Sequence, residues 1–513
     1  MSVTSYIKEN KKYLIYLIVS IVITWLLFLY LRLMALHDGI DFGVDVYYHI
    51  KAADLFPFIS RSKQFPWTEM SIWKMGFYDK ELGFHAILYF LRSVGYNLGI
   101  SFNAPFNFID MILFSAIVIV ASVGSYVYCK ATSFIVPPLL VFICPVFLEK
   151  LNTIRPFLVS IILFLLVMFL LMSRRKLSVK ILLIFICGWL YALCYSVPHL
   201  IVIPVLSYIA ACIYFERSKK SCYSIFLLLS AILGIAAGLY FHPQFPNTFT
   251  GWYIQGVEVI KQMLGLSKYE VWLGVGVLAP TGKLIFMNSL VVVLFLINWI
   301  FIAKTKNKSK ELLFLFVLQL VMIIGFFFSK RFIEYAVPAC VFSFAYTIGY
   351  YKKYVPNSFF FKFIYSSKLI IAALILIIMV PFGKSYLINL YKMAPLYEFG
   401  QWAPENIKPG TYIGLLHWGD FPRAFYTAER YSYSMALDPM FSYYIYPERT
   451  KKIEMFRLGN QLITPVELYE ALGTEYLYAS KHDHRAVMYL LDNGAQLLYN
   501  DKQGCLLKLP TTE

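Results

Sequence analysis

Long apolar runs separated by short polar segments fill the first 384 residues of the chain. A helix needs about 20 mostly apolar residues to cross a hydrocarbon core of ~30 Å, and eleven runs meet or approach this length. They are residues 13–35, 107–129, 133–148, 156–173, 179–196, 198–215, 223–241, 283–303, 311–329, 333–351 and 367–384. The pattern predicts an α-helical polytopic membrane protein with about 11 spans.

Basic residues predict the orientation of these spans. Lys and Arg cluster between the apolar runs, at residues 8–12, 130, 174–176, 217–220, 304–310 and 352–353. Short loops rich in Lys and Arg stay in the cytoplasm during insertion. With the N-terminus inside, every cluster falls on the cytoplasmic face, and residues 36–106, 242–282 and 385–513 lie outside. Residues 84–100 are apolar but contain His85, Arg92 and Asn97, which favours an amphipathic helix at the outer interface.

The last part of the chain has the pattern of a soluble domain. Strand-like and helix-like segments alternate in it, and two of the helices end at a glycine. Strands are predicted at 411–418 and 474–480, helices at 422–431, 467–473 and 484–494, and a hairpin at 495–509. This order predicts a small extracytoplasmic α/β domain, residues 385–513, that follows a transmembrane domain, residues 1–384.

Composition excludes several classes of protein. Of the 513 residues 59% are hydrophobic and 15% are charged, which is far from the composition of a soluble globular protein. The net charge of +17 is confined to the hydrophobic part, because residues 385–513 hold 12 Lys and Arg against 14 Asp and Glu. We therefore expect no nucleic-acid partner. The sequence contains no P-loop, no GxGxxG and no CxxC, which argues against an ATP-driven pump or a dinucleotide-binding enzyme.

Candidate chemistry begins directly after the first span. His37, Asp38, Asp41, Asp45 and His49 stand within 13 residues. Oxygen-rich clusters suit a hard divalent cation such as Mg²⁺ or Mn²⁺. A single carboxylate could instead serve as a general base, and an ordinary solvated loop is the remaining interpretation.

Cations are scarce on the predicted outer side between spans, so the pair of Lys330 and Arg331 departs from the pattern. An Arg guanidinium matches a phosphate bidentately, although Arg331 could also reach the lipid headgroups or pair with Glu334. A second short outer turn carries Glu149 and Arg155. Arg155 is a candidate for phosphate binding and Glu149 for a metal shell, while a Glu149–Lys150 pair without function is the alternative.

Trp418 and Asp420 follow a predicted strand of the tail. Ligands of α/β domains gather at the carboxyl ends of strands. A Trp beside an Asp offers an apolar wall and a hydrogen-bond acceptor, which suits a sugar or a peptide side chain. Packing of Trp418 onto the membrane surface is the alternative interpretation.

At these residues the chain resembles class C (GT-C) membrane glycosyltransferases, and within them the catalytic subunit of oligosaccharyltransferase. Residues 45–49 (DVYYH) are similar to that family's D-x-Y-Y-H stretch, 330–339 (KRFIEYAVPA) to R-F-x-Y-Y-x-x-P, and 417–421 (HWGDF) to W-W-D-Y-G. The resemblance implies that Asp45 is a metal ligand or catalytic carboxylate and that Arg331 contacts the donor phosphate. It also implies that Trp418 and Asp420 lie at the acceptor.

The function implied by this resemblance is transfer of a sugar or oligosaccharide from a polyprenyl-(pyro)phosphate donor to a protein or glycan acceptor, at a plasma membrane, with Mg²⁺ or Mn²⁺. The family's second acidic motif is expected near 149–156, where this chain reads NTIRP. A single-sugar transferase acting on a lipid or polysaccharide, a flippase or transporter of lipid-linked glycans, and a scaffold without activity are the alternatives. Few charges lie in the middle of the spans, which disfavours a transporter.

Overall fold

The computed structural model describes residues 3–35, 43–99, 105–216, 224–267, 279–305, 308–354, 368–389 and 394–511. The chain divides into two compact units. The first comprises residues 1–40, 94–238 and 276–391, and the second comprises 41–93, 239–275 and 392–513. The second unit therefore combines the predicted C-terminal domain with much of the two predicted outer loops.

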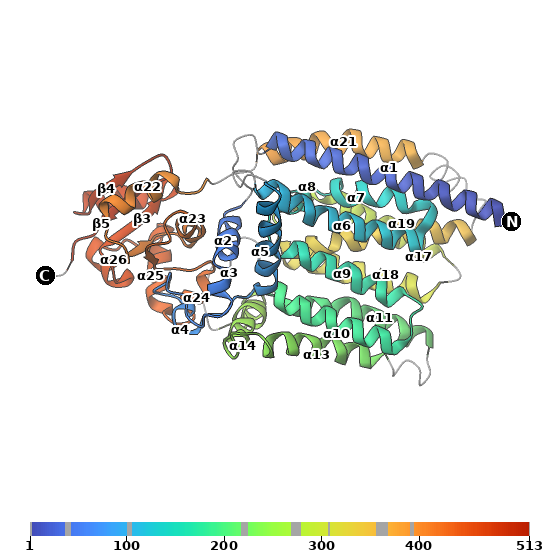
Figure 1. The fold of residues 1–513 in the computed structure, drawn as a ribbon, viewed down its shortest axis with the longest axis horizontal. Coiled ribbons are helices and arrows are strands. Elements are labelled where there is room, and N and C mark those ends of the chain that lie inside the picture. Colours follow the sequence, from blue (N-terminus) through green and yellow to red (C-terminus); the bar gives the residue numbers. More distant parts are fainter. Residues whose placement is uncertain are drawn as a thin grey trace. The chain divides into compact units, whose positions relative to one another are not determined.

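The first unit is a bundle of apolar helices that run side by side (Figure 1). Its longer helices are α1 (Val3–Ala35), α6 (Pro105–Cys129), α9 (Phe157–Met172), α10 (Leu177–Cys194), α11 (Val202–Glu216), α13 (Ile225–Tyr240), α17 (Ser289–Lys304), α18 (Lys310–Phe328), α19 (Ile333–Tyr354) and α21 (Lys368–Ile388). Its shorter ones are η1 (Lys130–Ile135), α7 (Val136–Phe142), α8 (Pro145–Leu151), η2 (Pro198–Ile201), α16 (Gly282–Met287) and η4 (Lys330–Phe332).

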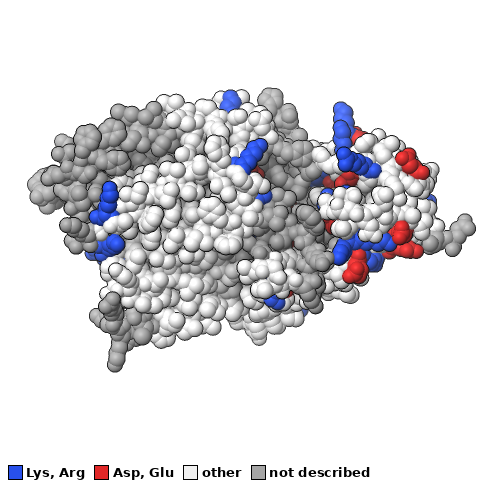
Figure 2. All heavy atoms as spheres, turned by 180° about the vertical axis from the view of Figure 1, so that it is seen from behind, with Lys and Arg blue, Asp and Glu red and all other residues white. Residues whose placement is uncertain are grey.

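The described part of the chain contains 6 helical stretches that are long and apolar enough to cross a membrane, and further apolar helices of 10–17 residues. Figure 2 shows a face of this bundle with few charged side chains, whereas the visible face of the second unit carries charges of both signs. The protein is a multi-pass membrane protein.

The shortest predicted span, residues 133–148, is not one continuous helix in the structure. Three short helices, η1, α7 and α8, occupy this region in place of one long helix. Pro137 and Pro138 stand in the first turn of α7, and Pro145 begins α8. Proline fits the first turn of a helix but interrupts a helix interior, so these residues divide the apolar run.

Small residues bring two helices of the bundle into close contact. A Cβ atom on Gly234 of α13 would lie 2.3 Å from the carbonyl oxygen of Phe185 in α10, and one on Gly188 would lie 2.8 Å from the carbonyl oxygen of Ala231. Gly234 and Gly238 form a GxxxG motif, the spacing that lets the backbones of membrane helices approach each other.

The second unit is an α/β domain formed by the tail and by two earlier segments of the chain, residues 41–93 and 239–275, which we call the first and second inserted segments. The inserted segments contain α2 (Asp45–Asp54), α3 (Phe56–Ile59), α4 (Trp73–Gly76), most of α5 (Leu82–Asn97), α14 (Asn247–Trp252), the π-helical η3 (Tyr253–Glu258) and α15 (Val259–Met263). The tail contains α22 (Tyr397–Asn406), η5 (Trp418–Asp420), α23 (Phe421–Thr427), α24 (Pro439–Tyr443), α25 (Pro447–Arg457), α26 (Pro465–Leu472), η6 (Lys481–Asp483) and α27 (His484–Asp492).

The sheet of this unit has the order β2-β1-β3-β5-β4. β1 (Tyr412–Leu415) is parallel to β2 (Ser432–Tyr433) and to β3 (Tyr476–Ser480), while β5 (Gly504–Lys508) is antiparallel to β3 and to β4 (Gln496–Asn500). The predicted strands, helices and terminal hairpin of the tail are therefore confirmed.

The first inserted segment joins the edge of this sheet. Tyr433 of β2 donates its backbone N–H to the carbonyl of Trp67 at 2.9 Å, and Glu69 N–H donates to the Tyr433 carbonyl at 2.7 Å. Thr68 and Tyr433 form a parallel bridge. Because an open edge strand needs hydrogen-bond partners, this pairing fixes the first segment to the tail.

Candidate functional site

Three buried ligand-type side chains meet in the second unit. His49 comes from α2. His85 lies in the first turn of α5, and Glu81 is the residue directly before that helix. One ligand atom of each lies within 4.8 Å of the ligand atoms of the other two, the only such group among the described residues. We call these three residues the His–Glu–His cluster.

Local sequence places two members of the cluster on one helix face. Glu81 and His85 are four residues apart, and the His85 N–H donates to the Glu81 carbonyl at 2.9 Å. Residues spaced by four lie on the same side of a helix. Asp79 accepts a hydrogen bond from the Glu81 backbone N–H at 3.1 Å, which fixes the beginning of α5.

A carboxylate stands behind the cluster. Asp79 Oδ2 lies 2.7 Å from His85 Nδ1, and His85 Nε2 lies 2.9 Å from His49 Nδ1. The side chains of Asp79 and His85 are fully buried. A carboxylate on the far nitrogen of a histidine orients the ring and raises its basicity, both in metal sites and in proton relays. The arrangement can therefore bind a cation or move a proton between the two imidazoles.

The donor atoms favour a particular kind of cation. Two imidazole nitrogens and one carboxylate oxygen are the ligands of Zn²⁺ and similar transition metals, whereas Mg²⁺ prefers oxygen alone. The sequence suggested Mg²⁺ or Mn²⁺, and the residues present fit a transition metal, Mn²⁺ included, better than Mg²⁺.

Aromatic rings cover the cluster. The Tyr48 ring centre lies 5.4 Å from that of His49 and 5.7 Å from that of His85. Burial, reinforced by Asp79 and Glu81, raises the pKa of the Tyr48 hydroxyl well above 10, so it stays protonated. Exclusion of water strengthens every charge interaction in such a site.

The second inserted segment holds Asp79 in place. Gln244 donates to the carbonyls of Ile59 at 2.6 Å and Ser62 at 2.8 Å, and its side-chain oxygen accepts from the Asp79 N–H. His242 Nε2 lies 3.2 Å from the Asp79 carbonyl. Burial lowers the pKa of His242, so this ring is neutral at pH 7 and its N–H donates.

A cation and the tail complete the surroundings. Lys80 Nζ lies 3.6 Å from a Glu81 carboxylate oxygen and 5.7 Å from the ring centre of Phe441 in α24. Gln255 of η3 donates to Asp438, the N-cap of α24, at 3.1 Å.

The sequence analysis did not predict Asp79, Lys80, Glu81 and His85 as site residues. The four-residue spacing of Glu81 and His85 in residues 78–85 (YDKELGFH) was a usable signal.

Asp45, the predicted catalytic carboxylate, lies in the first turn of α2 and is half-buried. It stands one helical turn before His49 but does not belong to the His–Glu–His cluster. Its role as a metal ligand therefore stays a prediction. His37, Asp38 and Asp41 lie outside the described residues.

A second polar cluster lies in the first unit. Lys150 of α8 pairs with Glu334 of α19 at 2.5 Å, and the Tyr195 hydroxyl donates to the other Glu334 oxygen at 3.3 Å. Tyr386 donates to Glu149 at 2.6 Å. The expected Glu149–Lys150 pair is therefore wrong, because each side chain has a partner from a distant part of the chain.

The two predicted phosphate-binding arginines belong to the same region. The Arg155 guanidinium carbon lies 5.8 Å from the Phe157 ring centre, and Lys150 Nζ lies 4.8 Å from the same ring. Arg331 is half-buried in η4, three residues before Glu334. Its charge acts on the Tyr195 hydroxyl that bonds Glu334. Lys150 thus pairs with the buried Glu334 carboxylate, and Arg331 stands three residues before it in the chain.

The predicted acceptor residues have different surroundings. Asp420 is fully buried and pairs with Arg423 at 3.0 Å, so the carboxylate is covered by protein. Trp418 is partly buried and packs against a cluster of buried apolar residues that includes Leu416, Leu468 and Leu477. An acceptor-binding role for Trp418 and Asp420 stays a prediction.

Two titratable groups beside Trp418 have opposite pKa shifts. Burial raises the pKa of Asp420 from 3.8 to about 7, against the opposing effect of Arg423. Burial lowers the pKa of His417 from 6.5 to about 4, with Arg457 adding to the decrease. Asp420 therefore removes stability as the pH rises from 3.8 to 7, whereas His417 adds stability as the pH rises from 4 to 6.5.

These effects oppose each other in the wild type, the Asp420 effect being worth roughly 4 kcal/mol and the His417 effect roughly 3 kcal/mol across their ranges. We expect Asp420→Asn to make the protein gain stability as the pH rises from 4.5 to 6.5, and His417→Gln to make it lose stability over the same interval. Unfolding temperatures of the full chain in detergent, followed by tryptophan fluorescence, check this. Equal slopes in the two variants would contradict the assignment.

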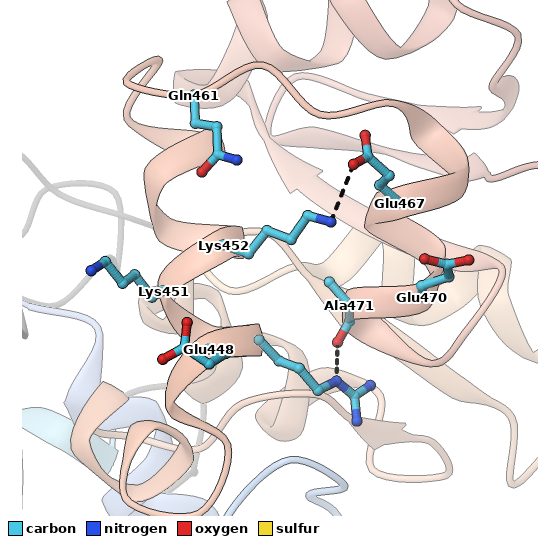
Figure 3. A pocket seen from close by; sticks show the side chains of 8 residues that line it. Glu448, Lys451, Lys452, Gln461, Glu467, Glu470 and Ala471 are labelled. Atoms are coloured by element: carbon cyan, nitrogen blue, oxygen red, sulfur yellow. Dashed lines mark hydrogen bonds and ion pairs between the residues drawn. The ribbon is translucent and has the colours of Figure 1, made fainter.

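The second unit also contains an open pocket of about 490 Å³ between α25 and α26 (Figure 3). Side chains of both charges line it, and Lys452 crosses it to Glu467 at 3.3 Å. Arg449 Nε donates to the Ala471 carbonyl at 2.6 Å. The pocket shares no residue with the His–Glu–His cluster.

Comparison with solved structures gives the fold. ArnT from Cupriavidus metallidurans bound to undecaprenyl phosphate has a TM-score of 0.52 and 10% identity to this chain, with 99% of this chain and 98% of ArnT covered. The chain has the class C glycosyltransferase fold. The resemblance predicted from the sequence is thereby confirmed at the level of the fold.

Two further structures are similar at lower scores. ArnT in the apo state has a TM-score of 0.49 and 10% identity, with 97% of this chain and 98% of that one covered. Arabinofuranosyltransferase AftD from Mycobacteria has a TM-score of 0.47 and 10% identity, with 95% of this chain and 40% of that one covered. The sequence matches no known family profile and no curated protein.

Proposed function

We propose that this GT-C protein transfers a sugar from a polyprenyl-phosphate or polyprenyl-pyrophosphate donor to an acceptor on the extracytoplasmic face. The observation that carries the proposal is the full-length likeness in fold to ArnT, whose structure holds undecaprenyl phosphate. The basic clusters between the apolar runs support the orientation. The second unit then lies on the outer side of the membrane.

The chemistry of the site supports a transferase. Transfer from a phosphate-linked donor needs a group that accepts the acceptor's proton and a cation that neutralises the departing phosphate. The proposal assigns proton transfer to Asp45 and the neighbouring Asp79–His85–His49 chain. It assigns the phosphate to Arg331, with Arg155 in support.

A metal would have a defined role. His49, Glu81 and His85 would hold it, and it would supply a Lewis acid that stabilises negative charge on an oxygen. The three residues then serve as ligands, and Asp79 orients His85 through the far nitrogen. The proton-transfer role falls to Asp45 in that case.

Protein, glycan and lipid are the three classes of acceptor for such a transferase. An oligosaccharyltransferase-like activity on protein would rest on Trp418 and Asp420, and the burial of Asp420 lends it no support. A glycan or lipid acceptor fits the remaining observations equally well. We therefore propose the donor class, and the native membrane extract used in the test supplies protein, glycan and lipid acceptors together.

The test is consumption of a lipid-linked donor by purified protein, followed by thin-layer chromatography in the presence of native membrane extract. Asp45→Ala should slow donor consumption by at least about 100-fold, because a positioned acid or base contributes 10²–10⁴-fold. Lys502→Ala, at an exposed hairpin turn, serves as the control. Wild-type protein that leaves a competent donor intact would contradict the proposal, and equal rates for Asp45→Ala and wild type would remove Asp45 from it.

A further inference from the structure

Arg331 and Glu334 have the spacing of an ion pair yet do not form one. Oppositely charged residues three apart on a helical segment attract each other. Among the described residues, however, the Arg331 side chain forms no hydrogen bond or ion pair. It is also only half-buried, so part of it is exposed. Its guanidinium donors are therefore available to a ligand.

Glu334 is held by other groups. One carboxylate oxygen pairs with Lys150 at 2.5 Å, and the other accepts from the Tyr195 hydroxyl at 3.3 Å. Glu334 is 1% exposed. A buried carboxylate needs a compensating charge, and here Lys150 provides it in place of the adjacent Arg331.

Lys150 is itself fixed in position. Its ammonium group lies 4.8 Å from the centre of the Phe157 ring at the start of α9, in cation–π contact. The start of α19 is fixed as well, because the Tyr335 hydroxyl lies 2.7 Å from both the Ser160 and the Tyr191 hydroxyl. The Lys150–Glu334 pair therefore joins two rigid helix ends.

We propose that Lys150 is a positioning residue that occupies Glu334 and so keeps the Arg331 guanidinium free for the phosphate of the lipid-linked donor. The inference rests on the proposed function and deepens it. Without the Lys150 charge, the buried Glu334 carboxylate turns to Arg331, the cation three residues before it in the chain, and competes with the donor phosphate. Removal of both charges abolishes this competition.

The experiment measures binding of undecaprenyl phosphate and the KM and kcat of donor consumption for four proteins: wild type, Lys150→Met, Glu334→Gln and the double variant. We expect Lys150→Met to weaken binding and to raise KM by about tenfold, the effect of one lost charge-assisted contact, with a smaller change in kcat. The double variant should bind within about threefold of wild type, and Glu334→Gln should bind at least as well as wild type.

Restored donor binding in the double variant distinguishes a positioning role of Lys150 from a purely structural role. A double variant that binds as weakly as Lys150→Met would overturn the inference, as would a Lys150→Met protein that binds like wild type. Wild-type protein that is folded but binds no undecaprenyl phosphate would instead defeat the proposed function itself. If Lys150→Met does not fold, Lys150→Gln carries the same test, with unfolding temperature in detergent as the folding control.

Discussion

Replacement of His85 by Ala is expected to reduce donor consumption by at least about 100-fold, as large an effect as that expected for Asp45→Ala. His85 is the central member of the buried chain, because one ring nitrogen meets Asp79 and the other meets His49. Its removal breaks both contacts and leaves the buried Asp79 carboxylate without its histidine partner, which costs about 1–3 kcal/mol or more.

The same variant distinguishes the two chemistries available to the His–Glu–His cluster. If the cluster holds a metal, purified wild type contains close to one bound transition metal ion per chain and His85→Ala contains much less. If it is a proton relay, metal content stays near zero in both, and Asp79→Asn reduces the rate to a similar degree. His484→Ala is the matched control, because this histidine is exposed at the start of α27.

A His85→Ala protein with wild-type donor consumption and wild-type unfolding temperature would exclude the cluster from the reaction. A large fall in unfolding temperature would assign the cluster a structural role. Comparison of His85→Ala with His85→Gln, which retains hydrogen-bonding capacity but lacks an imidazole, separates loss of packing from loss of chemistry.

Replacement of Arg331 by Ala is expected to reduce donor consumption by roughly 100- to 1,000-fold, the usual effect of removing one preorganised group that stabilises developing charge. Arg331 has no competing partner among the described residues, so its guanidinium is the main group that we assign to the donor phosphate. The loss should fall mainly on kcat/KM, measured with the same donor assay.

Arg331→Lys should recover only part of the activity, since a lysine supplies the charge without the planar pair of donors that matches a phosphate. Arg485→Ala, at an exposed position of α27, is the control for removal of one positive charge. Full activity of Arg331→Ala would contradict the phosphate role and would shift it to Arg155 or Lys80.

Local polar pairs were the weakest part of the sequence-based predictions. As alternatives to a functional role, the sequence offered a pair of Glu149 with Lys150 and a pair of Arg331 with Glu334, because adjacent charges attract. The folded chain instead pairs Lys150 with Glu334 across 184 residues. A buried carboxylate is stabilised by whichever cation the packing of the helices brings to it, and this choice has no local signature.

Amino-acid sequence alone determined most of the long apolar helices of the first unit and four of the five strands of the tail, β1, β3, β4 and β5. The length of an apolar run indicates a span, and alternation of apolar and polar residues indicates a strand. A glycine after a helical pattern indicates the end of the helix, as at Gly473 and Gly494, whose φ angles are 77° and 99°. These features depend on neighbouring residues along the chain. The tertiary structure alone decided the site, since His49 meets His85 across 36 residues and Gln244 fixes Asp79 across 165. Buried polar groups need partners wherever the backbone brings them together, and only the folded chain supplies that proximity.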